Sequence, residues 1–192
     1  MINIKSLRER LIGILYKAAI SSKRTRILLT PVGLIFFFSL LILLIIVSLE
    51  LDDVLRFPPL IAEPLNLTIS IPIIFIGLSL TGWSVHHFIK AKGTPVPLNP
   101  PSKLVTSGPY KHVRNPMLTG LFILFFGLGI LLKSISLTFI FTPFFILFNV
   151  LELKLIEEPE LKKRFGTQYV EYKKRVPMFI PRLKRKDPKK TV

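Results

Sequence analysis

The sequence PVGLIFFFSLLILLIIVSL, residues 31–49, indicates the fold class, because none of its nineteen side chains is charged. A helix of this length crosses the hydrocarbon core of a bilayer. Three more such runs follow, at 65–89 (interrupted only by two histidines), 117–132 and 134–151. Four runs of this kind in 192 residues are typical of a polytopic membrane protein and argue against a soluble domain.

The sequence therefore predicts an all-α fold, a membrane helix bundle with a cytoplasmic C-terminal helix. We expect four main transmembrane helices, or five if the N-terminal segment also crosses. Because the third run is short for about 30 Å of hydrocarbon and the fourth follows almost at once, these two should form a tight hairpin. The four spans are expected near residues 29–49, 67–89, 117–132 and 136–155.

The charge distribution predicts the orientation in the membrane. The net charge is +16, and bases outnumber acids in residues 1–30, 90–117 and 150–192, whereas residues 50–66 carry a net charge of −3. Since cytoplasmic loops are enriched in Lys and Arg, we expect both termini and the 90–117 loop in the cytoplasm. The basic residues should then contact membrane lipids rather than nucleic acid.

Two kinds of metal or redox site are not expected. The chain has no cysteine, which excludes disulfides, thiolate metal sites and a cysteine nucleophile. His86 and His87 are adjacent, with no cysteine and no suitably spaced carboxylate nearby, so no metal site is predicted there.

Polar residues gather before the third run. Asn115 and Pro116 have the pattern of a helix start, with Asn at the N-cap and Pro at the first helical position. The N–H groups of a helix start attract anions, and Lys111 and Arg114 add positive charge. We expect either a docking site for a carboxylate or phosphate, or simple contact with lipid headgroups.

A second polar group lies where the fourth run leaves the membrane. Glu157 and Glu158 are followed by Pro159, which cannot donate a hydrogen bond to the carbonyl of Leu155. The helix is therefore expected to kink or end beside the two carboxylates, with Arg114 as their partner. Ordinary surface pairing is the alternative: it would join Glu158 to Lys162 and Glu160 to Arg164, but it leaves Glu157 unexplained.

An aromatic helix follows. Phe165, Tyr169 and Tyr172 share one face of it. The helix either lies on the membrane surface with an aromatic belt or covers a site as a lid.

Two segments resemble the isoprenylcysteine carboxyl methyltransferase family and its relatives among membrane phospholipid methyltransferases. They are SGPYKHVRNPMLTG, residues 107–120, and EEPELKKRFGTQYVEYKKRVPMFIP, residues 157–181. Family members carry G-P-Y-x-x-x-R-[HN]-P-x-x-x-G and, after a hydrophobic hairpin, a pair of glutamates and F-G-x-x-Y-x-x-Y-K-x-x-V-P. The likeness covers about residues 92–181, in the same order and spacing.

The resemblance implies an integral membrane enzyme that binds S-adenosyl-L-methionine at its cytoplasmic face and methylates a lipophilic acceptor. Charge and hydropathy add an interfacial segment (1–28) and two spans (29–91) before the methyltransferase core that carries the likeness (92–181), and a basic tail (182–192) after it. The implied cofactor-binding residues are Gly108, Pro109, Tyr110, His112, Val113, Arg114, Asn115, Pro116, Leu118, Glu157 and Glu158, and Tyr169 joins them because its aromatic face suits a sulfonium.

Three functions stay open. Methylation of a carboxylate on an isoprenylcysteine-like acceptor comes first, with Arg114 or Arg175 orienting the carboxylate. Methylation of a lipid amine or a phospholipid headgroup comes second, with Glu158 removing the proton. A non-catalytic membrane scaffold or lipid-binding protein is the third.

Overall fold

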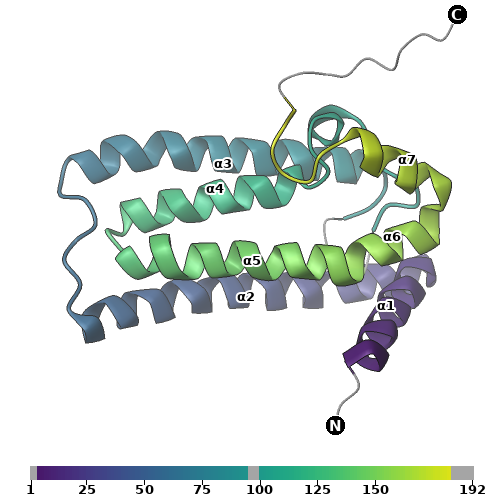
Figure 1. Ribbon diagram of the computed structural model, residues 1–192, viewed down its shortest axis with the longest axis horizontal. Coiled ribbons are helices and arrows are strands. Elements are labelled where there is room, and N and C mark those ends of the chain that lie inside the picture. Colours follow the sequence, from purple (N-terminus) through teal and green to yellow (C-terminus); the bar gives the residue numbers. More distant parts are fainter. Residues whose placement is uncertain (1–3, 95–99, 183–192) are drawn as a thin grey trace, which may run out of the picture.

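The computed structural model describes residues 4–94 and 100–182, and the regular structure of this part of the chain is entirely helical. Figure 1 shows helices α2, α3, α4 and α5 running side by side, with α1, α6 and α7 gathered at one end. The helices are α1 (Ile4–Ile20), α2 (Lys23–Leu55), α3 (Leu65–Lys90), η1 (Gly108–Lys111), α4 (Pro116–Leu131), η2 (Leu137–Phe141), α5 (Thr142–Glu152), η3 (Leu153–Glu157), α6 (Glu158–Phe165) and α7 (Thr167–Arg175).

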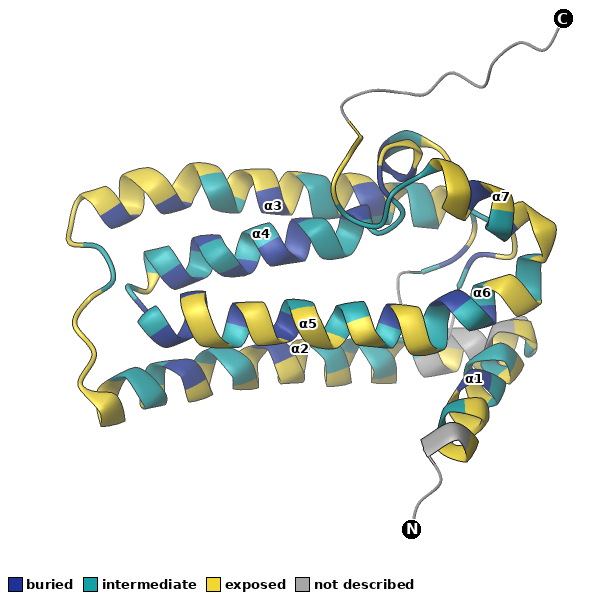
Figure 2. Cartoon of the chain, viewed as in Figure 1, coloured by how far each residue is buried: buried dark blue, intermediate teal, exposed yellow. Residues whose placement is uncertain are grey.

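Three helical stretches of the described chain are long and apolar enough to cross a membrane: Thr30–Leu55, Leu65–Lys90 and Leu137–Phe165. The shorter apolar helix α4 lies with them. The predicted all-α membrane bundle with a short third helix is therefore confirmed. The outward faces of α2 and α3 are largely exposed (Figure 2) and carry apolar side chains such as Phe36 and Phe75, each 71% exposed, which suits contact with lipid.

The N-terminal segment divides at a short break. Helix α1 ends at Ile20 and α2 begins at Lys23, where the side chain of Ser22 caps it by accepting from the N–H of Thr25. Residues 23–28, which the sequence places in the interfacial segment, thus continue the first spanning helix. Of the strap at 92–103, residues 95–99 lie outside the described part of the chain, as does nearly all of the basic tail.

Helices α3 and α4 cross in close contact through glycine. A Cβ atom on Gly77 would lie 2.7 Å from the backbone nitrogen of Leu124 and 2.8 Å from the carbonyl oxygen of Gly120. A Cβ on Gly127 would lie 2.8 Å from a side-chain carbon of Ile74. Real Cβ atoms do not come this close to other atoms. The two helices can therefore pack this closely only because glycine has no side chain at these positions.

The fourth span contains two π-helical segments, each just before a proline. Residues Leu137–Phe141 precede Pro143, and residues Leu153–Glu157 precede Pro159. Of the two outcomes expected at Pro159, a kink or an end of the helix, the end is wrong: helical structure continues through Pro159 to Phe165. The wider π turns remove the need for some of the hydrogen bonds that a proline cannot make.

The hairpin between α4 and the fourth span is tight, as predicted, and closes the far end of the bundle. Lys133 adopts a left-handed conformation (φ +58°), and the N–H of Ser134 donates to the carbonyl of Gly129 at 2.8 Å. Asp52 of α2 accepts hydrogen bonds from the hydroxyl of Ser134 and, at 2.8 Å, from the N–H of Ser136. This end of the molecule is therefore fixed to α2.

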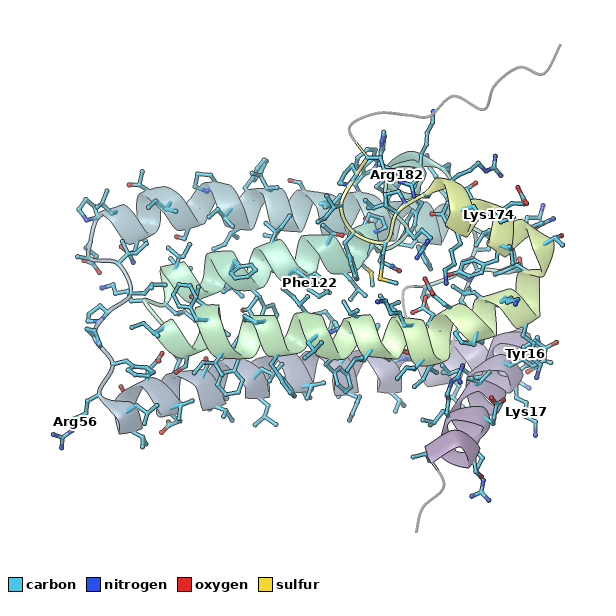
Figure 3. The ribbon with its side chains drawn as sticks, in the orientation of Figure 1. Tyr16, Lys17, Arg56, Phe122, Lys174 and Arg182 are labelled. Carbon is cyan, nitrogen blue, oxygen red and sulfur yellow. The ribbon has the colours of Figure 1, made fainter. Side chains whose placement is uncertain are left out.

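The interior of the bundle is aromatic. The rings of Phe125 and Phe145 are stacked with centroids 5.1 Å apart, and Phe122 meets Phe145 edge to face at 5.8 Å. Phe122 lies midway along the bundle, between the hairpin and the end that carries α6 and α7 (Figure 3). This core holds α4 in place, and the N-terminus of α4 forms part of the site described next.

Candidate active site

A pocket lies at the end of the bundle opposite the hairpin, where η1 and the start of α4 meet α6 and α7. The residues that line it come from α1, the end of α3 with Thr94, the 100–105 segment, η1, the start of α4 with the two residues before it, the end of η3, and the α6–α7 region. They are Leu15, Phe88, Thr94, Pro100, Pro101, Lys103, Leu104, Val105, Tyr110, Arg114, Asn115, Met117, Leu118, Glu157, Glu160, Leu161, Arg164, Phe165, Tyr169 and Tyr172.

Arg114 connects the two halves of the site. Its Nη2 donates to Oε1 of Glu158 at 2.6 Å, and its Nη1 donates to the carbonyls of Lys173 (3.0 Å) and Val176 (3.1 Å). The backbone N–H of Arg114 donates to the carbonyl of Pro177 at 2.8 Å. Its buried Nε has no hydrogen-bond partner among the described residues, so one donor of the guanidinium remains available.

Glu158 receives two cations. Besides Arg114, it accepts a hydrogen bond from Nζ of Lys173 at 2.5 Å, while only 8% of its side chain is exposed. The expected pairing of Arg114 with the acidic residues is therefore present, and the surface pair with Lys162 is not the one the structure forms. Two bonded cations offset the cost of burying this carboxylate.

Glu157 and Glu160 face the pocket, whereas Glu158 stands behind it. Glu160 is 4% exposed and pairs with Nε of Arg164 at 3.0 Å. Arg164 in turn donates to the carbonyl of Pro101 at 3.3 Å, which fastens the 100–105 segment over the pocket. The sequence places Glu160 and Arg164 in an ordinary surface pair, and their spacing alone gives no sign that this face turns inward.

Three buried tyrosines form another wall of the pocket. Tyr110, Tyr169 and Tyr172 are 5%, 4% and 7% exposed, and the hydroxyl of Tyr172 donates to the carbonyl of Tyr110 at 2.7 Å. Burial raises the pKa of all three phenols above the usual value for tyrosine, so they stay neutral at physiological pH. Helix α7 thus turns its aromatic face inward, as a lid would, rather than toward the membrane surface.

Helix α4 begins as the sequence predicts. Asn115 occupies the N-cap and Pro116 the first turn, but the Asn115 side chain makes no capping hydrogen bond within the described structure. The first-turn N–H groups of a helix have no partner inside the helix. Asn115, Met117 and Leu118 line the pocket, so the positive end of α4 contributes to its wall.

The remaining predicted residues surround this wall or lie outside it. Gly108 has φ +59°, and a Cβ there would lie 2.1 Å from the ring of His87, so only glycine fits. The side chains of His112 and Arg175 are exposed and lie outside the pocket. Tyr110, Arg114, Asn115, Leu118, Glu157 and Tyr169 line it, and Pro109, Val113, Pro116 and Glu158 are buried next to it.

Sequence reasoning missed several lining residues that come from distant parts of the chain. Leu15 of α1 and Phe88 of α3 both reach the pocket, and the ring of Phe88 lies 5.2 Å from that of Tyr110. A weak signal existed for Leu15, since Arg8, Ile12 and Leu15 share one face of α1 by helical spacing. No local pattern marks Phe88.

One family model and two curated proteins match parts of the chain. The model of the phospholipid methyltransferase family matches residues 65–168. A protein-S-isoprenylcysteine O-methyltransferase of Schizosaccharomyces pombe is 34% identical over 101 residues, which cover 52% of this chain and 40% of that protein. The nickel-cobalt-cadmium resistance protein NccN of Alcaligenes xylosoxydans xylosoxydans is 34% identical over 82 residues, 43% of this chain and 38% of its own length.

The chain thus spans about two-fifths of the length of these curated relatives. No solved structure shows a significant match to it. The family match covers more than half of the chain, and it includes the hairpin, Glu157 at the end of η3, and all of α6, which carries Glu158 and Arg164. The chain therefore belongs to the phospholipid methyltransferase family, a family of membrane methyltransferases.

Proposed function

We propose that the protein is a membrane methyltransferase that uses S-adenosyl-L-methionine and methylates a lipophilic acceptor at the pocket. The pocket carries this proposal, because it brings aromatic faces, a carboxylate and the start of an apolar helix together at one end of a membrane bundle. Family membership supports a methyl donor in general. The donor's identity and the acceptor are inferred from the resemblance to the isoprenylcysteine carboxyl methyltransferase family, together with the chemistry of the wall.

The residues of the pocket fit S-adenosyl-L-methionine, whose sulfonium supplies the methyl group when it is bound. The faces of Tyr110 and Tyr169 suit a cation, since an aromatic ring attracts positive charge to its face. Glu157 suits an amino group or ribose hydroxyls. The positive end of α4 and the unpartnered Nε of Arg114 suit a carboxylate.

For the acceptor, we favour the carboxylate of a lipophilic, isoprenylcysteine-like molecule. Transfer of a methyl group from a cation to an anion cancels two charges, so an environment with little water favours it. Leu104, Val105, Leu161 and Phe165 line the pocket and give it an apolar part. Because Arg175 is exposed, Arg164 and Arg114 are the better candidates for orienting the acceptor carboxylate.

Methylation of a lipid amine or phospholipid headgroup is the second candidate, and one observation favours it. Glu157 lines the pocket without any ion pair among those recorded for the described residues, so it could accept the proton that an amine must lose. The two reactions separate on product chemistry. A methyl ester releases methanol in mild base, whereas a methylated amine does not.

Calorimetric titration of the detergent-purified protein with S-adenosylhomocysteine tests the shared part of the proposal. We expect saturable binding, weakened about tenfold by Glu157→Gln because one charge-assisted hydrogen bond is lost. Glu171→Gln is the matched control, since Glu171 lies on α7 with its side chain 58% exposed, and it should leave affinity unchanged. Failure of the folded wild type to bind would favour a non-catalytic membrane scaffold.

A further inference from the structure

Helix α1 has three distinct faces. Arg8, Ile12 and Leu15 point toward the rest of the protein: Ile12 is 6% exposed and Leu15 reaches the pocket. The next face around the helix is apolar and exposed. It consists of Leu7 (48%), Leu11 (39%) and Ile14 (58%), spaced four and three residues apart.

The third face is charged. Arg10 and Lys17, one heptad apart, are both exposed, and Glu9 lies beside them. Figure 1 shows α1 lying across the end of the bundle, at a steep angle to the spanning helices, and Figure 3 shows Tyr16 and Lys17 at the end of α1 beside α6. An exposed apolar stripe next to a basic one, on a helix that crosses a membrane bundle, is the form of a helix that lies in the membrane interface.

The inward face of α1 meets the fourth span at an unusual point. Nε of Arg8 donates to the carbonyl of Leu155 at 2.9 Å. In a regular α-helix this carbonyl would accept from the N–H of residue 159, and Pro159 has none. Leu155 belongs to the π-helical segment Leu153–Glu157, in which the N–H of Glu158 reaches back to the carbonyl of Leu153.

A second contact lies about two turns further along each helix. Nζ of Lys163 lies 4.4 Å from the centroid of the Tyr16 ring, over its face. Arg8 and Tyr16 therefore hold α1 to both sides of the Pro159 position. Leu15, which lies between Arg8 and Tyr16 on α1, lines the pocket together with Glu157 and Leu161.

We propose that α1 is a brace that rests on the anionic surface of the membrane and holds the π-helical segment of the fourth span through Arg8. Arg8 replaces the helical donor that Pro159 lacks, and so acts as a positioning residue for Glu157 at the end of this segment. Leu7, Leu11 and Ile14 enter the lipid, while Arg10 and Lys17 meet its headgroups. The effect on ligand binding rests on the proposed function, but the brace itself does not.

Amide hydrogen exchange tests the brace in the detergent-purified protein without a ligand. We expect Arg8→Ala to speed exchange within residues 153–161 and to leave α3 and α4 unchanged. Arg10→Ala is the matched control, because Arg10 is an exposed arginine two residues away on the same helix, and it should change nothing. Arg8→Lys, which keeps a donor, should restore part of the protection.

Pro159→Ala makes the test specific to the carbonyl. This variant restores an N–H group at residue 159, so the carbonyl of Leu155 can accept a hydrogen bond from its own helix. The effect of Arg8→Ala should therefore shrink in the Pro159→Ala background, whereas a loss of mere packing around Arg8 would persist there. The brace is ruled out if Arg8→Ala speeds exchange equally in the wild-type and Pro159→Ala backgrounds. It is also ruled out if Arg8→Ala and wild type exchange at the same rate.

Titration with S-adenosylhomocysteine adds the functional readout. Arg8→Ala should weaken binding about tenfold relative to wild type and to Arg10→Ala. If wild type and both variants fail to bind while the exchange pattern is as expected, the proposed function fails and the brace stands. If wild type binds and Arg8→Ala binds equally well, the positioning role fails instead.

The membrane contact is tested by the fluorescence of single-tryptophan proteins in bilayers. Trp83, the only tryptophan of the chain, is replaced by Phe, and Ile14→Trp or Lys17→Trp is added. In bilayers that contain phosphatidylserine, brominated lipid should quench the tryptophan at 14 much more than the one at 17. Equal quenching at both positions would show that the apolar stripe of α1 does not face lipid.

Discussion

At the scale of single residues, Arg114 combines two tasks that are often separate. Three of its N–H groups donate hydrogen bonds, one to Glu158 and the others to the carbonyls of Lys173 and Val176. Arg114 therefore first assembles the site, and its buried Nε still has an N–H group available for a ligand. A planar guanidinium suits this work because it donates in several fixed directions at once, which a lysine cannot do.

Removal of a cation that pairs with the buried Glu158 should lower the stability of the fold. We expect Arg114→Ala to lower the free energy of unfolding by about 3 kcal/mol, because Glu158 keeps its charge in a buried place. Lys173→Ala should cost about 1 kcal/mol, since Lys173 is half exposed. Unfolding in mixed micelles of increasing SDS content measures both, with the exposed Lys174→Ala as a control near zero.

The sequence could predict that Arg114 meets the glutamate pair, but it could not tell which glutamate. Glu157 and Glu158 are neighbours, and about 100° of helix rotation separates them. The π segment before Glu158 adds a residue to the turn and so sets which carboxylate faces Arg114 and which faces the pocket. No local pattern in the sequence shows that this turn contains an extra residue.

At the scale of elements, the fourth span shows how a helix accommodates proline inside a membrane. Both of its π segments end just before a proline, at Pro143 and at Pro159. The sequence reveals the prolines and hence a disturbance of the helix, but it does not decide between a kink and a break. A break would expose backbone groups to lipid, so the continuous helix with wider turns has the lower free energy.

The contact between α3 and α4 gives an element-scale prediction. Gly77→Ala should destabilise the bundle by about 2–3 kcal/mol, because its Cβ would overlap the backbone of α4, which cannot rotate away. Gly82→Ala is the matched control on the same helix. Its Cβ meets nothing within 4 Å, and alanine is the better helix former, so stability should hold or rise. Thermal unfolding in detergent compares them; equal losses would contradict the close crossing.

At the scale of the whole molecule, charge separates the two ends of the bundle. Lys17, Lys174 and Arg182 lie at the end that carries α1 and α7, and Arg56 lies at the other end (Figure 3). Composition, hydropathy and proline placement predict the helices and the hairpin. They cannot predict that α1 folds back on α6 or that Phe88 reaches Tyr110, because these contacts join distant residues without a shared local pattern.

The predicted orientation can be tested directly because the chain has no cysteine. A single cysteine at Arg182→Cys should be protected from a membrane-impermeant maleimide in intact cells and react after lysis. Arg56→Cys should react in intact cells, since residues 50–66 are expected on the outer side. The reverse labelling pattern would place the pocket on the outer face.

The backbone pairing around Arg114 also has a consequence for how the protein is made. The N–H groups of Arg114 and Asn115 donate to the carbonyls of Pro177 and Met178, so the pocket is completed by residues that leave the ribosome long after α4. A nascent chain already inserted in the membrane must wait with an open, incomplete site until residue 178 emerges. The pocket of a newly synthesised chain therefore stays incomplete until its C-terminal partner segment has been made and has folded back onto Arg114 and Asn115.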